Sequence, residues 1–297
     1  MLLQMEIADV GSFCMRFNVS SQVSYTVSGP STLILNVHAL RNGVQMINEE
    51  SFLVEPKVSC EEFVLDQGQN RFVRIETGSV KELKITYRAT VDTRVNLIPM
   101  AKLRAMAVSK LDRNVIPFIY PSRYCQSDKL GRLAYNKFGK IDHPFEKATA
   151  ITEWIYKNVQ YLSGSTNWQT SAYDTVTERA GVCRDFAHLG IALCRALNIP
   201  ARYFTGYAHQ LQPPDFHACF EAHVGGAWLI FDPTKLVPLN GLVRIATGRD
   251  AADAAVATIF GPTSAKAVQV SCEPAEPGFK PITQNQLGKN GICLDAP

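Results

Sequence analysis

Cys183 is the residue whose position most directly suggests chemistry. It lies in the stretch RAGVCRDFAHL and opens an apolar segment. The apolar residues after it recur at helical spacing until Asn198-Ile199-Pro200. The spacing predicts a helix whose first turn contains Cys183, where unpaired N–H groups and the helix dipole favour an anion. We therefore expect this thiol to ionise more readily than a free cysteine, whose pKa is about 8.5.

A cysteine at the start of a helix has two interpretations. It can be a small buried hydrophobe, as we expect for Cys194 in the middle of the same helix. It can instead be a nucleophile, which needs a base and a group that orients this base. The choice depends on whether the sequence supplies both partners.

Both partners occur downstream, in the stretch FHACFEAHVGGAWLIFDPTK. The pattern predicts two strands joined at Gly225-Gly226, which would form an antiparallel hairpin. His217 and Cys219 share one face of the first strand, and Asp232 ends the second strand before a proline. At a perfect register Asp232 falls short of the position opposite His217, so contact between imidazole and carboxylate needs a bulge or an offset. The hairpin makes the contact possible without fixing it.

A cysteine, a histidine and a carboxylate in this order are suited to acyl transfer. His217 would hold the Cys183 proton, the thiolate would attack an amide carbonyl, and backbone N–H groups near Cys183 would stabilise the oxyanion. Protonated His217 would then protonate the leaving amine, while Asp232 holds the ring. Attack of water on the thioester makes a hydrolase, whereas attack of an amine makes a transamidase. The residues alone do not choose between these two outcomes.

The elements that must position these residues lie in two halves of different character. Up to about Leu97 the chain consists of short alternating or β-branched runs, such as LKITYRATVD, separated by polar or glycine-bearing turns. Later, helical spacing is clearest from His143 to Tyr161, with Pro144 in the first turn. The sequence predicts an α+β protein with an antiparallel β-sandwich over residues 1–115, a core of helices plus antiparallel sheet over 116–275, and an extended tail over 276–297.

Three motifs between Thr170 and Gly261 carry a family resemblance. GVCRDFAHL with a helix ending in RALNIPAR, then DFHACFEA, then WLIFDPT resemble the transglutaminase-like superfamily of papain-like thiol enzymes. The β-rich first half is similar to the accessory domain of bacterial members. The resemblance implies a papain-like core with its nucleophile, Cys183, at a helix N-terminus. It further implies that His217 is the general base and Asp232 the orienting carboxylate, with no cofactor and no metal.

The resemblance implies thiol-dependent acyl transfer on a peptide or protein amide. We expect a cysteine peptidase or amidase, because the chain shows no sign of the extra domains and calcium-ligand clusters of animal transglutaminases. Three alternatives stay open: a protein-glutamine transamidase, a non-catalytic binding module that docks a partner through its β-sandwich, and an arylamine-type acyl transferase.

Composition and charge narrow the classes of partner. The chain has 30 Lys and Arg residues against 27 Asp and Glu residues. The resulting net charge of +3 does not indicate the strongly basic surface that binds nucleic acid. No run approaches the roughly 18 apolar residues of a membrane span, and the opening MLLQMEIADV does not resemble a signal peptide. We therefore expect a cytoplasmic protein without nucleic-acid or membrane partners. The eight cysteines include no CxxC pair, which argues against a zinc ribbon or a disulfide framework.

Other polar residues near the motifs receive weaker assignments. A loop role is favoured for Asn167 and Gln169 over donation to an oxyanion, and Arg184 and Asp185 are interpreted as a solvated first helical turn. The loop from Gln210 to Asp215 is expected to form the substrate rim. The position of His188 on its helix argues against a triad role. One alternative is a metal site, although its spacing is not typical of zinc: His209, His217, Cys219 and His223.

Overall fold

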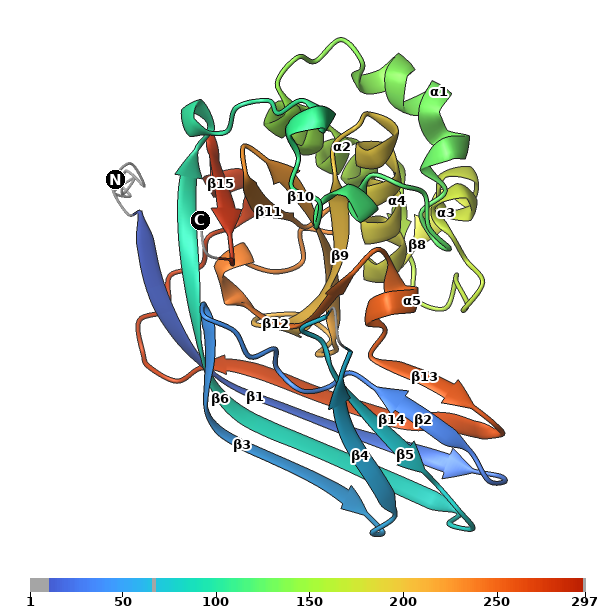
Figure 1. The fold of residues 1–297 in the computed structure, drawn as a ribbon. Coiled ribbons are helices and arrows are strands. Elements are labelled where there is room, and N and C mark those ends of the chain that lie inside the picture. The colour runs from blue at the N-terminus through green and yellow to red at the C-terminus, as the bar shows by residue number, and fades with distance from the viewer. Residues whose placement is uncertain (1–10, 66–67, 296–297) are drawn as a thin grey trace.

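The computed structural model describes residues 11–65 and 68–295. Within them, one nine-stranded sheet runs through both halves of the chain, a four-stranded sheet covers one end of it, and helices cover the other end (Figure 1). The prediction that the chain begins without a signal peptide concerns residues 1–10, which lie outside the described residues. Among the described residues, no helix combines the length and the apolar content that spanning a bilayer requires.

The strands fall into two sheets and one short parallel pair. The nine-stranded sheet has the order β12-β9-β10-β11-β15-β6-β1-β14, with β3 also pairing to β6. Its strands are β1 (Ser12–Val27), β3 (Gln45–Glu55), β6 (Glu82–Pro99), β9 (Ala201–Ala208), β10 (His217–Val224), β11 (Ala227–Phe231), β12 (Leu242–Gly248), β14 (Thr263–Pro274) and β15 (Asn290–Cys293). The second sheet consists of β2 (Thr32–Leu35), β4 (Ser59–Val64), β5 (Arg71–Glu76) and β13 (Ala257–Phe260). The parallel pair is β7 (Gln160–Tyr161) and β8 (Ala180–Gly181).

The first half forms the predicted β-sandwich. Alternating residues of β1 and β6 point toward β2 and β5 and share one apolar core with them. The core residues are Val23, Tyr25, Val27, Leu33, Leu35, Val73, Ile75, Leu83 and Ile85. LKITYRATVD lies in the first part of β6, as its period-2 pattern predicts. The α+β fold class, with a β-rich first half before a core of helices and sheet, is confirmed.

The described part of the second half contains five α-helices, which lie on the strands β9, β10, β11 and β12 or pack on the helices that do. They are α1 (Ser127–Phe138), α2 (Pro144–Asn158), α3 (Ala172–Glu178), α4 (Cys183–Ala196) and α5 (Ala251–Ala254). Helix α4 is surrounded by α1, α2, α3 and the sheet, so every residue from Asp185 to Arg195 is buried. A Cβ at Gly190 would lie 2.5 Å from Phe220 Cε1, so this glycine allows α4 to approach β10 closely.

Helix α2 is shorter than its periodicity predicts. It ends at Asn158, because Val159 adopts an extended conformation and the chain enters β7. There the Gln160 N–H donates to Arg179 O at 2.8 Å, and the Leu162 N–H donates to Gly181 O at 2.9 Å. Inter-strand hydrogen bonds to a distant segment therefore replace the last helical turn, and they bring Tyr161 next to the start of α4.

Strands near the end of the second half pair with strands of the first half. Strands β13 and β14 pair with β2 and β1, although they lie inside the range 116–275 predicted for the core. The tail predicted as an extended strap contains β15, which lies between β11 and β6 and joins the two halves into one sheet. Local composition does not reveal such pairing, because the partner strands are far away in the sequence.

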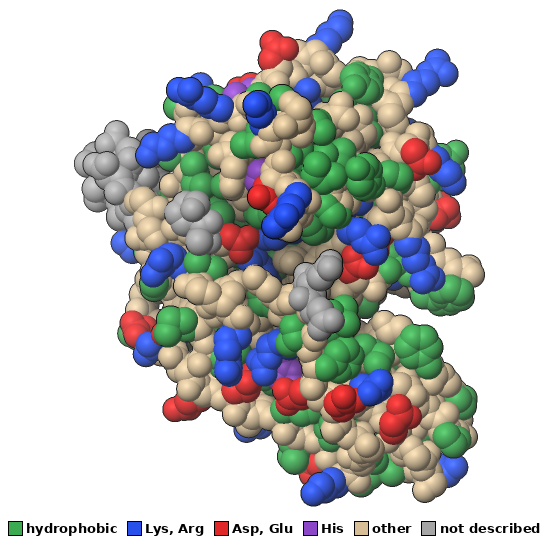
Figure 2. Space-filling view, in the orientation of Figure 1, with side chains coloured by type: hydrophobic (Ala, Val, Ile, Leu, Met, Phe, Trp, Pro, Cys, Tyr) green, Lys and Arg blue, Asp and Glu red, His purple; other side chains and the backbone are tan. Residues whose placement is uncertain are grey.

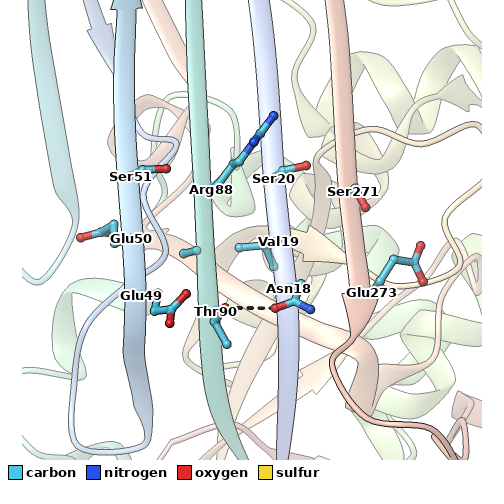
Figure 3. Close-up of a pocket in the computed structure, with 11 residues that line it drawn as sticks. Asn18, Val19, Ser20, Glu49, Glu50, Ser51, Arg88, Thr90, Ser271 and Glu273 are labelled. Atoms are coloured by element: carbon cyan, nitrogen blue, oxygen red, sulfur yellow. Dashed lines mark hydrogen bonds between the residues drawn. The ribbon is translucent and has the colours of Figure 1, made fainter.

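The outer face of the sandwich carries a broad polar hollow. Side chains from four neighbouring strands, β3, β6, β1 and β14, line it (Figure 3). Thr90 Oγ1 donates to Asn18 Oδ1 at 3.0 Å across this face. Elsewhere on the surface, Lys and Arg side chains are interspersed with Asp and Glu side chains on the face that Figure 2 shows.

Candidate active site

Cys183 is the first residue of α4, as its spacing predicts. Val182 is the N-cap in an extended conformation, and its N–H donates to Asp185 Oδ2 at 2.9 Å. Arg184 donates to the other oxygen of the same carboxylate, with Nη2 at 3.0 Å. Asp185 is fully buried, so its assignment to a solvated first turn is wrong: the carboxylate folds back to close the helix start. These contacts hold the Cys183 backbone N–H at a rigid helix terminus.

Replacing Asp185 by Ala is expected to lower the free energy of unfolding by about 1–3 kcal/mol, because the Val182 N–H and the Arg184 guanidinium lose their buried acceptor. Urea denaturation followed by circular dichroism measures this loss. Asp128→Ala is the matched control, since Asp128 is exposed in the first turn of α1 and such surface changes stay within about 0.5 kcal/mol. Equal losses in the two variants would contradict the capping role.

His217 and Asp232 lie at the open end of the predicted hairpin. Val224 pairs with Ala227 across the turn, and the regular pairing ends at Phe220 and Phe231. Beyond that pair, the segment after β11 is free to turn, and Asp232 Oδ2 comes within 3.1 Å of His217 Nε2. The chain therefore leaves the regular hairpin register after Phe231, which is the offset that contact between His217 and Asp232 requires.

Thr234 holds the Asp232 carboxylate in place. Its N–H and its hydroxyl donate to Asp232 Oδ1 at 2.9 and 2.7 Å. Asp232 is fully buried, and His217 is 1% exposed. One carboxylate oxygen thus receives two hydrogen bonds from Thr234, which leaves the other for the imidazole.

The buried pair is electrostatically stabilised as an ion pair. Burial alone lowers the pKa of His217, but the Asp232 carboxylate and a hydrogen bond to Cys183 hold it well above its usual value. Burial alone raises the pKa of Asp232, yet His217 and the Thr234 donors hold it below the ordinary range. His217 Nδ1 is buried, and no described residue forms a hydrogen bond of regular geometry with it. Nδ1 is therefore the nitrogen available to the Cys183 thiol.

The cysteines differ in their access to solvent. Cys183 is partly exposed, Cys14 and Cys60 are exposed, and the other five are buried. Cys219 lies within 4.8 Å of His217 and Asp232, but burial and the nearby carboxylate raise its pKa to about 12. Cys219 therefore stays a neutral thiol, while Cys183 combines an imidazole partner with access to the surface.

A cleft of about 780 Å³ opens beside Cys183 and His217. Its size falls within the roughly 300–1,000 Å³ typical of ligand sites. Apolar side chains from α5, from β13 and from the segment between these two elements form one wall, and aromatic and basic side chains form much of the rest. The lining residues are Arg123, Tyr124, Trp168, Cys183, Arg184, Tyr203, Thr205, Phe216, His217, Ala218, Ala251, Ala252, Ala255, Val256, Ala257, Thr258 and Ile259.

Tyr161 is a site residue that sequence reasoning missed. Its hydroxyl interacts with Cys183, and burial together with Cys183 raises the pKa of Tyr161 to about 12. The hydroxyl therefore stays protonated at neutral pH. The sequence offered no separate signal for this residue, because Tyr161 follows directly on a helical pattern and appeared to be its last residue.

The other predicted residues have structural roles. The His188 ring stacks on Tyr124, and its Nε2 accepts a hydrogen bond from the Ala251 N–H at 3.1 Å. Asn167 has the favoured loop role, because its Oδ1 accepts from the Gln169 N–H at 2.7 Å. The loop from Gln210 to Asp215 contributes no residue to the cleft, whose wall here begins at Phe216.

The four-residue metal site does not assemble among the described residues. His217 and Cys219 lie together with Asp232, not with the other two histidines. His209 Nδ1 is 2.9 Å from Cys272 O, and the His223 ring packs edge-on against Trp228. What the site brings together is a partly exposed thiol, a buried imidazole and a buried carboxylate, which is a set suited to nucleophilic attack.

Two family models match the chain. A model of the N-terminal domain of bacterial transglutaminases matches residues 15–114, and a model of the transglutaminase-like superfamily matches residues 132–233. A solved structure, that of a candidate cysteine protease from Cytophaga hutchinsonii, is 56% identical. The match covers 96% of this chain and 100% of that one, with a TM-score of 0.93.

More distant relatives occur in mycobacteria. An uncharacterised protein of Mycobacterium leprae is 29% identical over 189 residues, which are 59% of this chain and 66% of that protein. An uncharacterised protein of Mycobacterium tuberculosis is 35% identical over 115 residues, 33% of this chain and 36% of that protein. The chain thus spans less than two thirds of the length of these relatives. The matched models and the 56% identical structure, taken with the fold, place the chain in the transglutaminase-like superfamily.

Proposed function

We propose that this protein is a cysteine peptidase or amidase whose nucleophile is Cys183. The observation that carries the proposal is the buried His217–Asp232 pair, with Nε2 and Oδ2 3.1 Å apart, at the wall of the cleft that Cys183 enters. Burying such a pair costs folding free energy, because each charge must be desolvated, and a functional role would explain why the pair is present. Activation of a neighbouring thiol supplies that role.

The reaction follows from the two ring nitrogens. Asp232 holds Nε2, so Nδ1 takes the proton of the Cys183 thiol, and the thiolate forms a bond to the amide carbonyl carbon. The tetrahedral intermediate collapses as His217 gives this proton to the leaving nitrogen, which departs as an amine and leaves a thioester. Water then attacks the thioester with His217 as base, and the carboxylic acid and the free thiol are released.

The oxyanion would receive two donors. One is the Cys183 backbone N–H, which lies at the positive end of α4. The other is the Tyr161 hydroxyl, which already contacts Cys183 and stays protonated at neutral pH. Pairing of β7 with β8 holds Tyr161 in register with Gly181, two residues before the nucleophile.

Tyr161→Phe is expected to lower kcat by about 10²-fold with an unchanged melting temperature, because it removes one oxyanion donor and leaves the ring in place. Steady-state hydrolysis and thermal denaturation measure the two quantities. Tyr135→Phe is the control, since Tyr135 is 57% exposed on α1 and does not line the cleft. A kcat equal to that of the wild type would remove Tyr161 from the mechanism.

Hydrolysis is preferred over transamidation. The C. hutchinsonii structure of 56% identity is a candidate cysteine protease, and the cleft leaves the thioester open to solvent on the exposed side of Cys183. The test is to incubate wild type and Cys183→Ala with a peptide mixture, with and without a primary amine, and to analyse products by mass spectrometry. New peptide termini that depend on Cys183 support the hydrolase. Amine-containing products without new termini would replace it by a transamidase, and no Cys183-dependent product would refute both.

A further inference from the structure

The cleft beside Cys183 has one wall made of small apolar side chains. Ala252, Ala255, Val256 and Ala257 are partly or fully exposed on this wall, and the half-buried ring of Phe216 adjoins it. Alanines leave open the volume that larger side chains would fill. This wall therefore has space for an apolar side chain of a substrate, and burying such a side chain is favourable.

Arg123 supplies a positive charge at the rim of the same cleft. Its guanidinium carbon lies 5.0 Å from the centre of the Tyr124 ring and 6.0 Å from that of Trp168, so two rings hold it in position. Among the described residues, no carboxylate forms an ion pair with Arg123, whereas the neighbouring Arg184 is paired with Asp185.

The charge of the lining is unbalanced. Among the described residues that line the cleft, Arg123 and Arg184 carry positive charge, and none is an aspartate or a glutamate. A guanidinium that is positioned by aromatic rings and lacks a protein carboxylate suits a carboxylate from outside, which it can bind through two parallel hydrogen bonds.

The segment next to the cleft is also apolar and exposed. Leu162, Trp168 and Tyr173 are 45%, 66% and 47% exposed, and they follow Tyr161 along the chain. Exposed aromatic side chains near a cleft provide contact area for an extended partner. This favours a peptide over a small amide as the occupant.

We propose that the preferred substrate of this cleft is a peptide that carries an apolar side chain and, within a few residues of it, a carboxylate bound by Arg123. The inference rests on the proposed function, since it names the substrate class of the same site. The carboxylate can be the free C-terminus of a peptide or an acidic side chain, and the two sources share the chemistry that Arg123 recognises.

The test uses acetylated hexapeptides with leucine at each position in turn, prepared with a C-terminal carboxylate or carboxamide. A second set of carboxamides places Glu or Gln beside the leucine. Mass spectrometry of competing peptides gives ratios of kcat/KM. We expect the wild type to prefer the carboxylate in at least one set by about ten-fold to a hundred-fold, which is typical of a charge-assisted hydrogen bond. The set that shows the preference identifies the source of the carboxylate.

Arg123→Gln is expected to abolish this preference, because kcat/KM falls more for the carboxylate peptide of each pair than for its uncharged partner, since rim charges act mainly on charged partners. Ala255→Leu is expected to keep the carboxylate preference and to shift the apolar preference from leucine to alanine. Arg132→Gln is the matched control, because Arg132 is exposed on α1 and does not line the cleft. Equal cleavage of carboxylates and carboxamides by the wild type, or a preference that survives in Arg123→Gln, would overturn the proposal.

Failure of the proposed function would look different. If the wild type cleaves none of these peptides, binding of the same matched pairs to Cys183→Ala by calorimetry still measures recognition. Tighter binding of the carboxylates that is lost in Cys183→Ala/Arg123→Gln supports the proposed substrate class. Equal binding of both members of each pair, or binding of neither, overturns it.

Discussion

Iodoacetamide is expected to alkylate Cys183 ahead of the other seven cysteines and to keep doing so down to about pH 5, whereas His217→Ala loses this reactivity at low pH. The reason is that the pKa of His217 lies well above its usual value, so its imidazolium persists beside the sulfur and favours the thiolate. An ordinary thiol with a pKa of about 8.5 is ionised in roughly one molecule in 3 × 10³ at pH 5. The alkylation rates at Cys183 should therefore differ by about 10³-fold between the two proteins.

Peptide mass spectrometry across a pH series measures these rates separately for each cysteine. Cys14 is the internal reference, because it is exposed, and Cys219→Ala tests whether the second thiol near His217 contributes. If Cys183 and Cys14 gain reactivity together as the pH rises, the thiolate–imidazolium pair does not form. Cys183 would then be a structural residue of α4, and the binding-module alternative would gain support.

The parts of the site that the sequence predicted are those with local signals. The first-turn position of Cys183 follows from helical spacing over the residues after it, and the hairpin follows from Gly225-Gly226, both with positive φ. The meeting of His217 with Asp232 was possible from the hairpin but not determined by it. It depends on the turn in which Thr234 donates to Asp232, and such side-chain hydrogen bonds leave no periodic pattern.

The parts that the sequence did not predict depend on contacts between distant segments. Tyr161 reaches Cys183 only because β7 pairs with β8, and the apolar wall of the cleft comes from residues 251–259, far from all three motifs. Strand β15 joins the halves through pairing to β6 and β11. Hydrophobic periodicity describes the environment of one segment at a time, so it cannot say which segment lies next to another.

Asp232→Asn is expected to lower kcat by about 10⁴-fold, which is the loss for the corresponding change in the serine-protease triad. The variant keeps a side chain of the same shape beside His217 Nε2 but removes the charge that supports the imidazolium. It also puts an amide group in the place of the carboxylate oxygen that orients the ring as a hydrogen-bond acceptor. The amide N–H can donate to Nε2 and so select the wrong tautomer of His217. Steady-state hydrolysis of a cleaved peptide measures kcat. An activity within ten-fold of the wild type would exclude Asp232 as the orienting group.

The same variant should lose stability in a pH-dependent way. The folded pKa of His217 is raised above 6.5, so its contribution to stability is complete below pH 6.5 and declines as the pH rises towards the folded value. The folded pKa of Asp232 is lowered below 3.8, so its contribution is complete above pH 3.8 and declines as the pH falls. The pair therefore stabilises the protein most between pH 3.8 and 6.5.

Removing one member of a buried pair typically costs about 3–5 kcal/mol. We expect Asp232→Asn to lower the free energy of unfolding by nearly this amount near pH 6 and by clearly less near pH 8.5. At the higher pH, His217 contributes less to the stability of the wild type. Urea denaturation of both proteins at the two pH values measures the difference, and Asp128→Asn on the surface of α1 corrects for the general effect of removing a charge. A loss of the same size at both pH values would mean that His217 and Asp232 are not an ion pair in the folded protein, and the thiolate–imidazolium mechanism would lose its electrostatic basis.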